Sequence, residues 1–172
     1  MKHNHPKIEI MDTTLRDGEQ TSGVSFVPHE KLMIARLLLE ELRVDRIEVA
    51  SARVSEGEFN AVRMICDWAA RKNLLSRVEV LGFVDGKTSV DWIYNTGCRV
   101  INLLTKGSEK HCTFQLKKTL QEHLADIRQT VAYAIDKGMD VNVYLEDWSN
   151  GIKDSPDYVF GLVDGLKDTG IR

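Results

Sequence analysis

The sequence has few residues that cross-link or rigidify a chain: three cysteines and three prolines among 172 residues. Cys66, Cys98 and Cys112 are odd in number and far apart, unlike the disulfide framework of a small secreted domain. The simplest interpretation of these cysteines is a reduced protein with a cytoplasmic location.

The chain also lacks long hydrophobic runs and a large excess of either charge. No apolar stretch approaches the ~20 residues of a membrane-spanning helix, and the first six residues lead into no hydrophobic segment of a signal peptide. The formal net charge is only −3, so nothing indicates a surface for nucleic acid. We therefore expect no membrane and no nucleic acid among its partners.

The composition that remains is that of an ordinary globular domain, with 42% hydrophobic and 28% charged residues. Strand and helix patterns alternate along the whole chain. Strands are expected at residues 8–12, 46–50, 78–83, 100–105 and 141–146, and helices at 29–42, 57–72, 88–95, 119–137 and 156–168. Five β-α units without a linker predict one α/β domain over residues 1–172, with a parallel sheet and right-handed crossovers.

The predicted strands have one apolar face and one face that mixes polar with large side chains. In the second strand, Ile47 and Val49 lie opposite Arg46 and Glu48. A sheet covered by helices on both sides is usually apolar on both faces. The mixed face therefore favours a barrel with its helices outside, in which inward acids such as Glu48 and Glu79 must be paired.

The polar stretch from Asp12 to Gln20 directly follows the first predicted strand and reads DTTLRDGEQ. It places Arg16 beside Asp17 at the strand end where parallel α/β proteins assemble active sites. A solvated turn with structural ion pairs is the alternative explanation of these charges. The residues alone predict a site here without excluding that alternative.

The same stretch resembles the signature of the acyl-CoA-condensing TIM-barrel synthases, namely 2-isopropylmalate, homocitrate and citramalate synthases. Hydroxymethylglutaryl-CoA lyase is a more distant relative. The resemblance continues through residues 44–54 (VDRIEVASARV), 81–85 (LGFVD), 102–108 (NLLTKGS) and 143–150 (VYLEDWSN), which look most like the citramalate synthase branch. It implies a TIM (β/α)8 barrel, of which this chain would hold the N-terminal five β-α units, because eight units need about 250 residues.

The resemblance also implies a reaction. Acetyl-CoA, as co-substrate, would condense with a small α-keto acid in a metal-assisted Claisen-type step, with pyruvate giving (R)-citramalate and CoA. The cofactor would be a divalent metal ion, Zn, Mn or Mg, acting as a Lewis acid. The full-length enzyme is expected to be a homodimer in the cytoplasm. The runner-up is 2-isopropylmalate synthase, which takes the branched acceptor 2-oxoisovalerate.

Specific residues can be assigned roles on this resemblance. Asp17 matches a metal ligand of the family. Arg16 would bind substrate and stabilise the oxyanion that develops on the keto acid, unless it only forms an ion pair with Asp12, Asp17 or Glu19. Gln20 would contact substrate oxygens or order the loop. Glu146, at the end of the fifth strand, is expected to act in catalysis, to pair with Arg16, or both.

The strand alternation places three large side chains, Leu81, Leu104 and Tyr144, each two residues beyond an inward polar residue. We predict that they form one layer near the mouth of the barrel, as part of the acceptor-binding pocket. Such a wall fits a keto acid with a very small side chain. Filling of the barrel core would explain these side chains without any ligand.

Two features fit the family pattern less well. The family's HxH metal ligands belong to a later strand, and His3 and His5 precede the first strand, so they belong at the opposite end of the barrel. We therefore expect the 172-residue piece to be inactive alone, or to be a non-catalytic half-barrel that needs a partner chain. His111 and Cys112 lie in a predicted loop without a third catalytic partner. The lysines nearby would meet coenzyme A phosphates or only solvent: Lys106, Lys110, Lys117 and Lys118.

Overall fold

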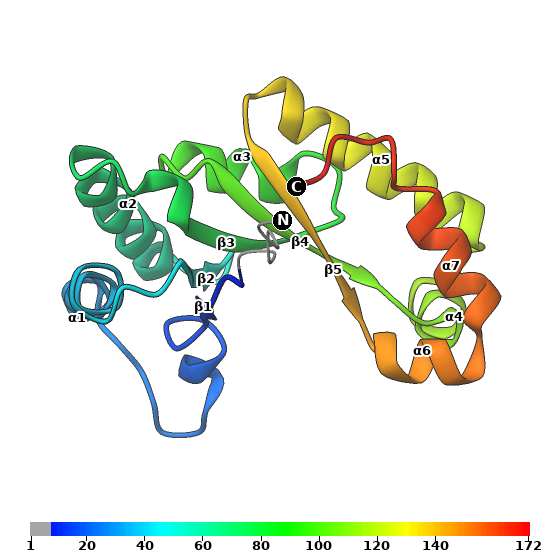
Figure 1. The fold of residues 1–172 in the computed structure, drawn as a ribbon, viewed down its shortest axis with the longest axis horizontal. Helices are drawn as coiled ribbons and strands as arrows, with labels where there is room; N and C mark the ends of the chain where they lie inside the picture. The colour runs from blue at the N-terminus through cyan, green and yellow to red at the C-terminus, as the bar shows by residue number, and fades with distance from the viewer. Residues whose placement is uncertain (1–7) are drawn as a thin grey trace, which may run out of the picture.

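The computed structural model describes residues 8–172, so His3 and His5 lie outside the described residues. Five parallel strands form one sheet in the order of the sequence. They are β1 (Met11–Asp12), β2 (Arg46–Ser51), β3 (Val78–Phe83), β4 (Val100–Lys106) and β5 (Asp140–Glu146). A doubly wound sheet reverses its strand order, whereas this order is that of a barrel wall. The sheet curls as part of an incomplete TIM barrel, which confirms the predicted fold class (Figure 1).

The helices that follow the strands lie along the outer side of the curved sheet (Figure 1). They are α1 (Pro28–Arg36), α2 (Glu56–Arg71), α3 (Thr88–Asn95), α5 (Leu120–Asp136) and α7 (Pro156–Asp164). The first predicted helix continues from α1 as the π-helical turn η2 (Leu37–Leu42). Within residues 8–172, none of the helices combines the length and the apolar character needed to cross a membrane.

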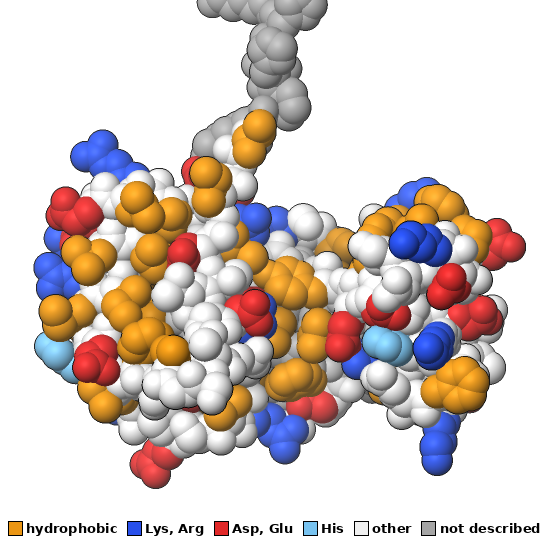
Figure 2. Space-filling view, turned by 90° about the horizontal axis from the view of Figure 1, so that it is seen from below, with side chains coloured by type: hydrophobic (Ala, Val, Ile, Leu, Met, Phe, Trp, Pro, Cys, Tyr) orange, Lys and Arg blue, Asp and Glu red, His pale blue; other side chains and the backbone are white. Residues whose placement is uncertain are grey.

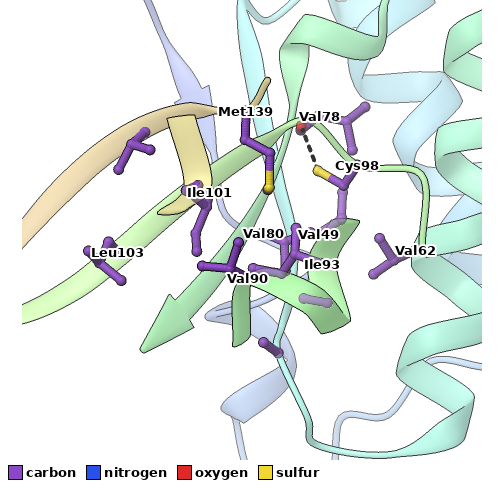
Figure 3. Close-up of a cluster of buried hydrophobic side chains, with 14 of the residues drawn as sticks. Val49, Val62, Val78, Val80, Val90, Ile93, Cys98, Ile101, Leu103 and Met139 are labelled. Atoms are coloured by element: carbon purple, nitrogen blue, oxygen red, sulfur yellow. Dashed lines mark hydrogen bonds between the residues drawn. The ribbon is translucent and has the colours of Figure 1, made fainter. Parts of the chain in front are cut away.

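The hydrophobic core lies between the sheet and these outer helices. Figure 3 shows part of it, where Val80 of β3 and Ile101 of β4 lie close to Val90 and Ile93 of α3. At most 1% of each of these residues is exposed. Burying an aliphatic side chain of this size contributes about 1.5–3 kcal/mol. The apolar strand face predicted from the alternation is thus the outer face of the barrel wall, which leaves the mixed face pointing inward.

The structure differs from the prediction at the edge of the sheet and in the connections. The first strand is short because its pairing with β2 begins only at Met11, and 63% of Ile10 is exposed. Several short helical segments were not predicted, since each is too short for its residues to show a helical period. They are η1 (Gly18–Gln20), η3 (Leu75–Arg77), α4 (Glu109–His111), η4 (Cys112–Leu116) and α6 (Trp148–Asp154). His111 and Cys112 therefore lie in a helical segment, and their assignment to a loop was wrong.

All five strands run towards the same rim, which carries the loop after β1 together with α4 and α6 (Figure 1). Figure 2 looks at the molecule from this side. The molecule narrows in the middle, and hydrophobic side chains are exposed there between charged ones. This rim is the end of a parallel barrel at which ligands bind.

Candidate active site at the carboxyl ends of the strands

The loop that follows β1 is folded tightly by its own backbone. The carbonyl oxygen of Thr13 accepts hydrogen bonds from the amides of Arg16, Asp17 and Gly18 at 3.1, 2.8 and 3.2 Å. Leu15 is fully buried and anchors the turn from below. Arg16 and Asp17 consequently project from a rigid turn at the rim.

Arg16 is held between two carboxylates. Its Nη1 donates to Asp17 Oδ1 at 2.7 Å, and its Nε donates to Glu48 Oε2. Glu48 is fully buried, whereas 60% of the Asp17 side chain is exposed. The predicted pairing with Asp17 is thus present, and the partner that the sequence did not reveal is Glu48 from β2. Arg16 has five N–H donors, so donors remain for a substrate oxygen.

A chain of polar contacts crosses the inner face of the sheet below Arg16. Asn102 donates to Glu48 Oε1 at 2.7 Å, and Asn142 donates to Asn102 Oδ1 at 2.7 Å and to Glu79 Oε2 at 3.3 Å. Arg46 donates to Glu79 Oε1 at 3.1 Å. The inward acids are therefore paired, as predicted, because a buried charge without partners is costly. This chain of contacts fixes the carboxylate that orients Arg16.

Glu146 lies at the end of β5, in register with Lys106 at the end of β4. The ammonium of Lys106 pairs with Glu146 Oε2, whereas the sequence had suggested Arg16 as the partner. The side chain of Glu146 is 41% exposed. The Glu146 carboxylate therefore stays accessible at the rim, and Lys106 is engaged at the end of the barrel wall.

The predicted layer of three large side chains is only partly correct. Leu104 is in register with Tyr144, as expected. Leu81, however, is in register with Asn102, one inward position below, and Phe83 takes the place beside Leu104. The offset between parallel strands is set by the barrel and is not visible in one strand's alternation. Leu104 and Tyr144, together with Glu146 and other residues of β5, α6 and α7, line an open hollow of about 610 Å³.

Tyr144 has its hydroxyl group 3.6 Å from Met11 Sδ, at the opposite edge of the sheet. Burial, together with the negative charges of Glu48 and Glu79, raises the pKa of Tyr144 well above its ordinary value. The phenol therefore holds its proton more firmly than an exposed tyrosine and can donate a hydrogen bond.

A second hollow, of about 410 Å³, lies between the loop after β1 and the start of α2. Arg16 and Gln20 line one side, and Ser51 at the end of β2, with Val54 and other residues after it, lines the other. This hollow was not predicted from the sequence. Its only sequence signal is the small polar segment after β2, which is too ordinary to be specific.

A third hollow, of about 710 Å³, lies at the outer part of the rim beside Ser108, His111 and Asp147. Ser108 Oγ donates to Asp147 Oδ2 at 2.8 Å, and His111 Nε2 lies 3.6 Å from the same oxygen. Hydrogen bonds from Asn150 and then from Ser108 lower the pKa of Asp147. The serine donates to the acid and not to the histidine, so the three groups do not form a nucleophilic triad. Cys112 is fully buried, consistent with no role as a nucleophile.

Comparisons with known proteins decide the family. The profile of the HMGL-like family matches residues 7–171. The chain belongs to the HMGL-like family. It is 42% identical over 142 residues to the 2-isopropylmalate synthase of Saccharolobus solfataricus, covering 82% of this chain and 35% of that protein. It is 37% identical over 165 residues to a putative (R)-citramalate synthase of Methanopyrus kandleri, covering 95% of this chain and 30% of that protein.

The homocitrate synthase of Methanopyrus kandleri is also similar, with 41% identity over 144 residues, 82% of this HMGL-like chain and 34% of that protein. The chain thus spans about a third of the length of these relatives. Among solved structures, the HMG-CoA lyase of Bacillus subtilis superposes with a TM-score of 0.66 at 20% identity, covering 96% of this chain and 56% of that one. These relatives support the predicted family. Three synthase activities appear at similar identity, so the comparisons do not single out the citramalate branch.

Proposed function

We propose that residues 8–172 form the N-terminal part of the catalytic barrel of an acyltransferase that condenses acetyl-CoA with a small α-keto acid. The observation that carries the proposal is the placement of Arg16 within the DTTLRDGEQ signature. It lies at the rim of the barrel wall, held by Asp17 and the buried Glu48. Relatives named as 2-isopropylmalate, citramalate and homocitrate synthases support this class of reaction.

In this proposal Arg16 supplies fixed positive charge where negative charge develops on the keto oxygen. Its two carboxylate partners orient it before substrate arrives, so little reorganisation is needed during the reaction. Glu146, accessible at the end of β5, takes part in proton transfer or orients the substrate. Gln20 and Arg16 both line the hollow of about 410 Å³, where the Gln20 amide contacts a substrate oxygen.

A divalent metal ion, when bound, would polarise the keto group of the acceptor. The exposed carboxylate of Asp17 is the group of this chain that would hold it. Within residues 8–172, no three His, Cys, Asp or Glu side chains gather closely enough to enclose a metal ion. In this proposal the described residues supply Asp17 to such a site, and the full-length enzyme supplies the remaining ligands.

Pyruvate is the acceptor that we propose, with (R)-citramalate as product. Leu104 and Tyr144 narrow the hollow beside Glu146, and 2-oxoisovalerate carries two more carbons than pyruvate. Once the remaining strands of a full-length barrel close this open hollow, forcing extra carbons against its apolar wall would cost about 1–3 kcal/mol. We therefore expect a higher kcat/KM with pyruvate than with 2-oxoisovalerate. This preference favours a role in isoleucine biosynthesis over one in leucine biosynthesis.

The test is an assay of the full-length protein with acetyl-CoA and a panel of keto acids. We expect the highest kcat/KM with pyruvate. Leu104→Ala should improve the relative kcat/KM for 2-oxoisovalerate by roughly tenfold, the scale of one or two methylenes in an apolar pocket. Leu81→Ala is the matched comparison and should change it less, because Leu81 lies one position deeper. A wild-type preference for 2-oxoisovalerate would replace the assignment by 2-isopropylmalate synthase.

The second candidate is a half-barrel that acts only with a partner chain. The open hollow along β5, lined by apolar residues such as Val143, Leu145 and Trp148, favours it. The 172-residue chain alone is expected to be inactive in the same assay. Restoration of activity by a separate chain that carries the missing strands would favour the second candidate. A cytoplasmic location and a homodimeric full-length enzyme remain predictions from the sequence.

A further inference from the structure

Lys31 of α1 is a fully buried lysine that the catalytic assignments above leave unused. Its ammonium lies 2.6 Å from Glu19 Oε2 and 2.6 Å from Glu58 Oε1. It also donates to the carbonyl oxygens of Leu15 at 3.1 Å and Val49 at 3.3 Å. An ammonium has three donors, so these four oxygens, from the loop after β1, β2 and α2, more than satisfy it.

The two carbonyl groups are placed in a particular way. Leu15 directly precedes Arg16, and Val49 directly follows Glu48, so Lys31 contacts the backbone beside each member of the Arg16–Glu48 ion pair. The pairing of β2 with β3 shifts register between Glu48 and Ser51. A bulge leaves carbonyl groups outside the regular ladder, and Lys31 satisfies one in this irregular segment.

The two carboxylates that pair with Lys31, those of Glu19 and Glu58, lie on opposite walls of the 410 Å³ hollow. Glu19 belongs to the loop wall, beside Arg16 and Gln20, and its other oxygen accepts from the Phe26 amide at 2.9 Å. Glu58 belongs to the opposite wall, in the first turn of α2. Burial raises the pKa of Glu58, and the charge of Lys31 acts in the opposite direction. Lys31 thus joins the loop, β2 and α2 at one buried point.

We propose that Lys31 is a positioning residue, which fixes Arg16 relative to Glu48 by tying together the backbone segments that carry them. This inference rests on the proposed catalytic role of Arg16. A lysine that merely filled the core would need acceptors for its ammonium, but not acceptors adjacent to both members of the pair. Without Lys31, Glu19 and Glu58 face each other across a mostly buried space, and the loop loses its attachment on both sides of Arg16.

The test replaces Lys31 by methionine in the full-length protein and follows both amide hydrogen exchange and kinetics. Exchange of the amides of residues 13–20 should rise at least about tenfold, because several charge-assisted hydrogen bonds are lost. Exchange in β3 and β4 should stay unchanged. In the synthase assay kcat should fall by roughly 10²-fold, the cost of a small misplacement of a catalytic group. KM should change by less than about threefold.

Lys72→Met is the matched control, since Lys72 pairs with Glu40 at 3.1 Å on the exposed surface at the end of α2. It should change neither the exchange of the loop nor kcat. If Lys31→Met fails to fold, Glu19→Gln takes its place, because it leaves Lys31 balanced by Glu58 and removes only the ionic tie to the loop. Loop exchange should then rise by about threefold or more, while that of the first turn of α2 stays unchanged.

Two results would overturn the proposal. One is unchanged loop exchange, or a rise of equal size throughout the protein, which would make Lys31 an ordinary stabilising residue. The other is normal kcat in a Lys31→Met variant that retains synthase activity, which would leave the proposed function intact. If the wild-type protein lacks synthase activity, the function fails, and the exchange pattern still decides whether Lys31 positions the loop.

Discussion

At the residue scale, Arg16 is the side chain on which the proposed chemistry depends. Removing its charge should act on the transition state more than on substrate binding. We expect Arg16→Gln to lower kcat by ~10²–10³-fold, the usual cost of losing an oxyanion donor, with a smaller effect on KM. Steady-state kinetics of the full-length protein measure this.

The same substitution removes the guanidinium that pairs with the buried Glu48, which keeps its hydrogen bond from the amide of Asn102 at 2.7 Å. Thermal unfolding of the Arg16→Gln variant is therefore a necessary control, because a buried acid that loses its cation destabilises a fold. Near-normal kcat in a folded variant would reduce Arg16 to a structural ion pair. The sequence had left that alternative open, and it would then be the correct one.

At the scale of elements, α6 is attached to the end of β4 through two glycines. A Cβ on Gly151 would lie 2.3 Å from the carbonyl oxygen of Gly107, which is backbone and cannot move aside easily. The amide of Gly107 in turn donates to the carbonyl of Glu146 at 2.7 Å. The close approach of these elements therefore holds Glu146 and Asp147 in place at the rim.

We expect Gly151→Ala to destabilise the protein by about 1–3 kcal/mol, the range for overpacked sites. Gly57→Ala is the matched control in a helix, since a Cβ there would meet only Ser55 Oγ, at 3.5 Å. It should be neutral or stabilising by up to about 1 kcal/mol, because alanine favours helix. Urea unfolding measures both, and equal stability of the two variants would contradict the packing argument.

At the scale of the whole molecule, the chain is a barrel wall with an open inner face. Its described residues offer Asp17 as a metal ligand without a gathered set of partners. We expect the 172-residue chain to bind Zn²⁺ or Mn²⁺ weakly, because affinity follows the number and preorganisation of ligands. Titration calorimetry checks this, with a variant that lacks His3 and His5 as the control. Tight one-to-one binding that survives loss of both histidines would contradict this expectation and show a metal site formed by other residues of the chain.

The sequence by itself determined the five β-α units and the two faces of the sheet. Both follow from local periodicity, since alternation assigns Ile101 outward and Asn102 inward, and helical spacing assigns the apolar side of α2. It also located the candidate site, because the Asp12 to Gln20 stretch packs rare polar choices into a few residues after a strand. These features depend on residues that are close in the sequence, so they can be predicted from local sequence patterns.

The tertiary structure alone decided which distant groups meet. Arg16 and Glu48 are 32 positions apart, and no local pattern selects Glu48 over the other acids nearby. The register that pairs Leu81 with Asn102 depends on the stagger of neighbouring strands, which the closure geometry of a barrel imposes. Lys31 has an ordinary helical sequence context, and only the convergence of α1, α2, β2 and the loop makes it a buried junction. Contacts between residues so far apart in the sequence arise from packing in three dimensions. No local sequence pattern identifies which residues will meet.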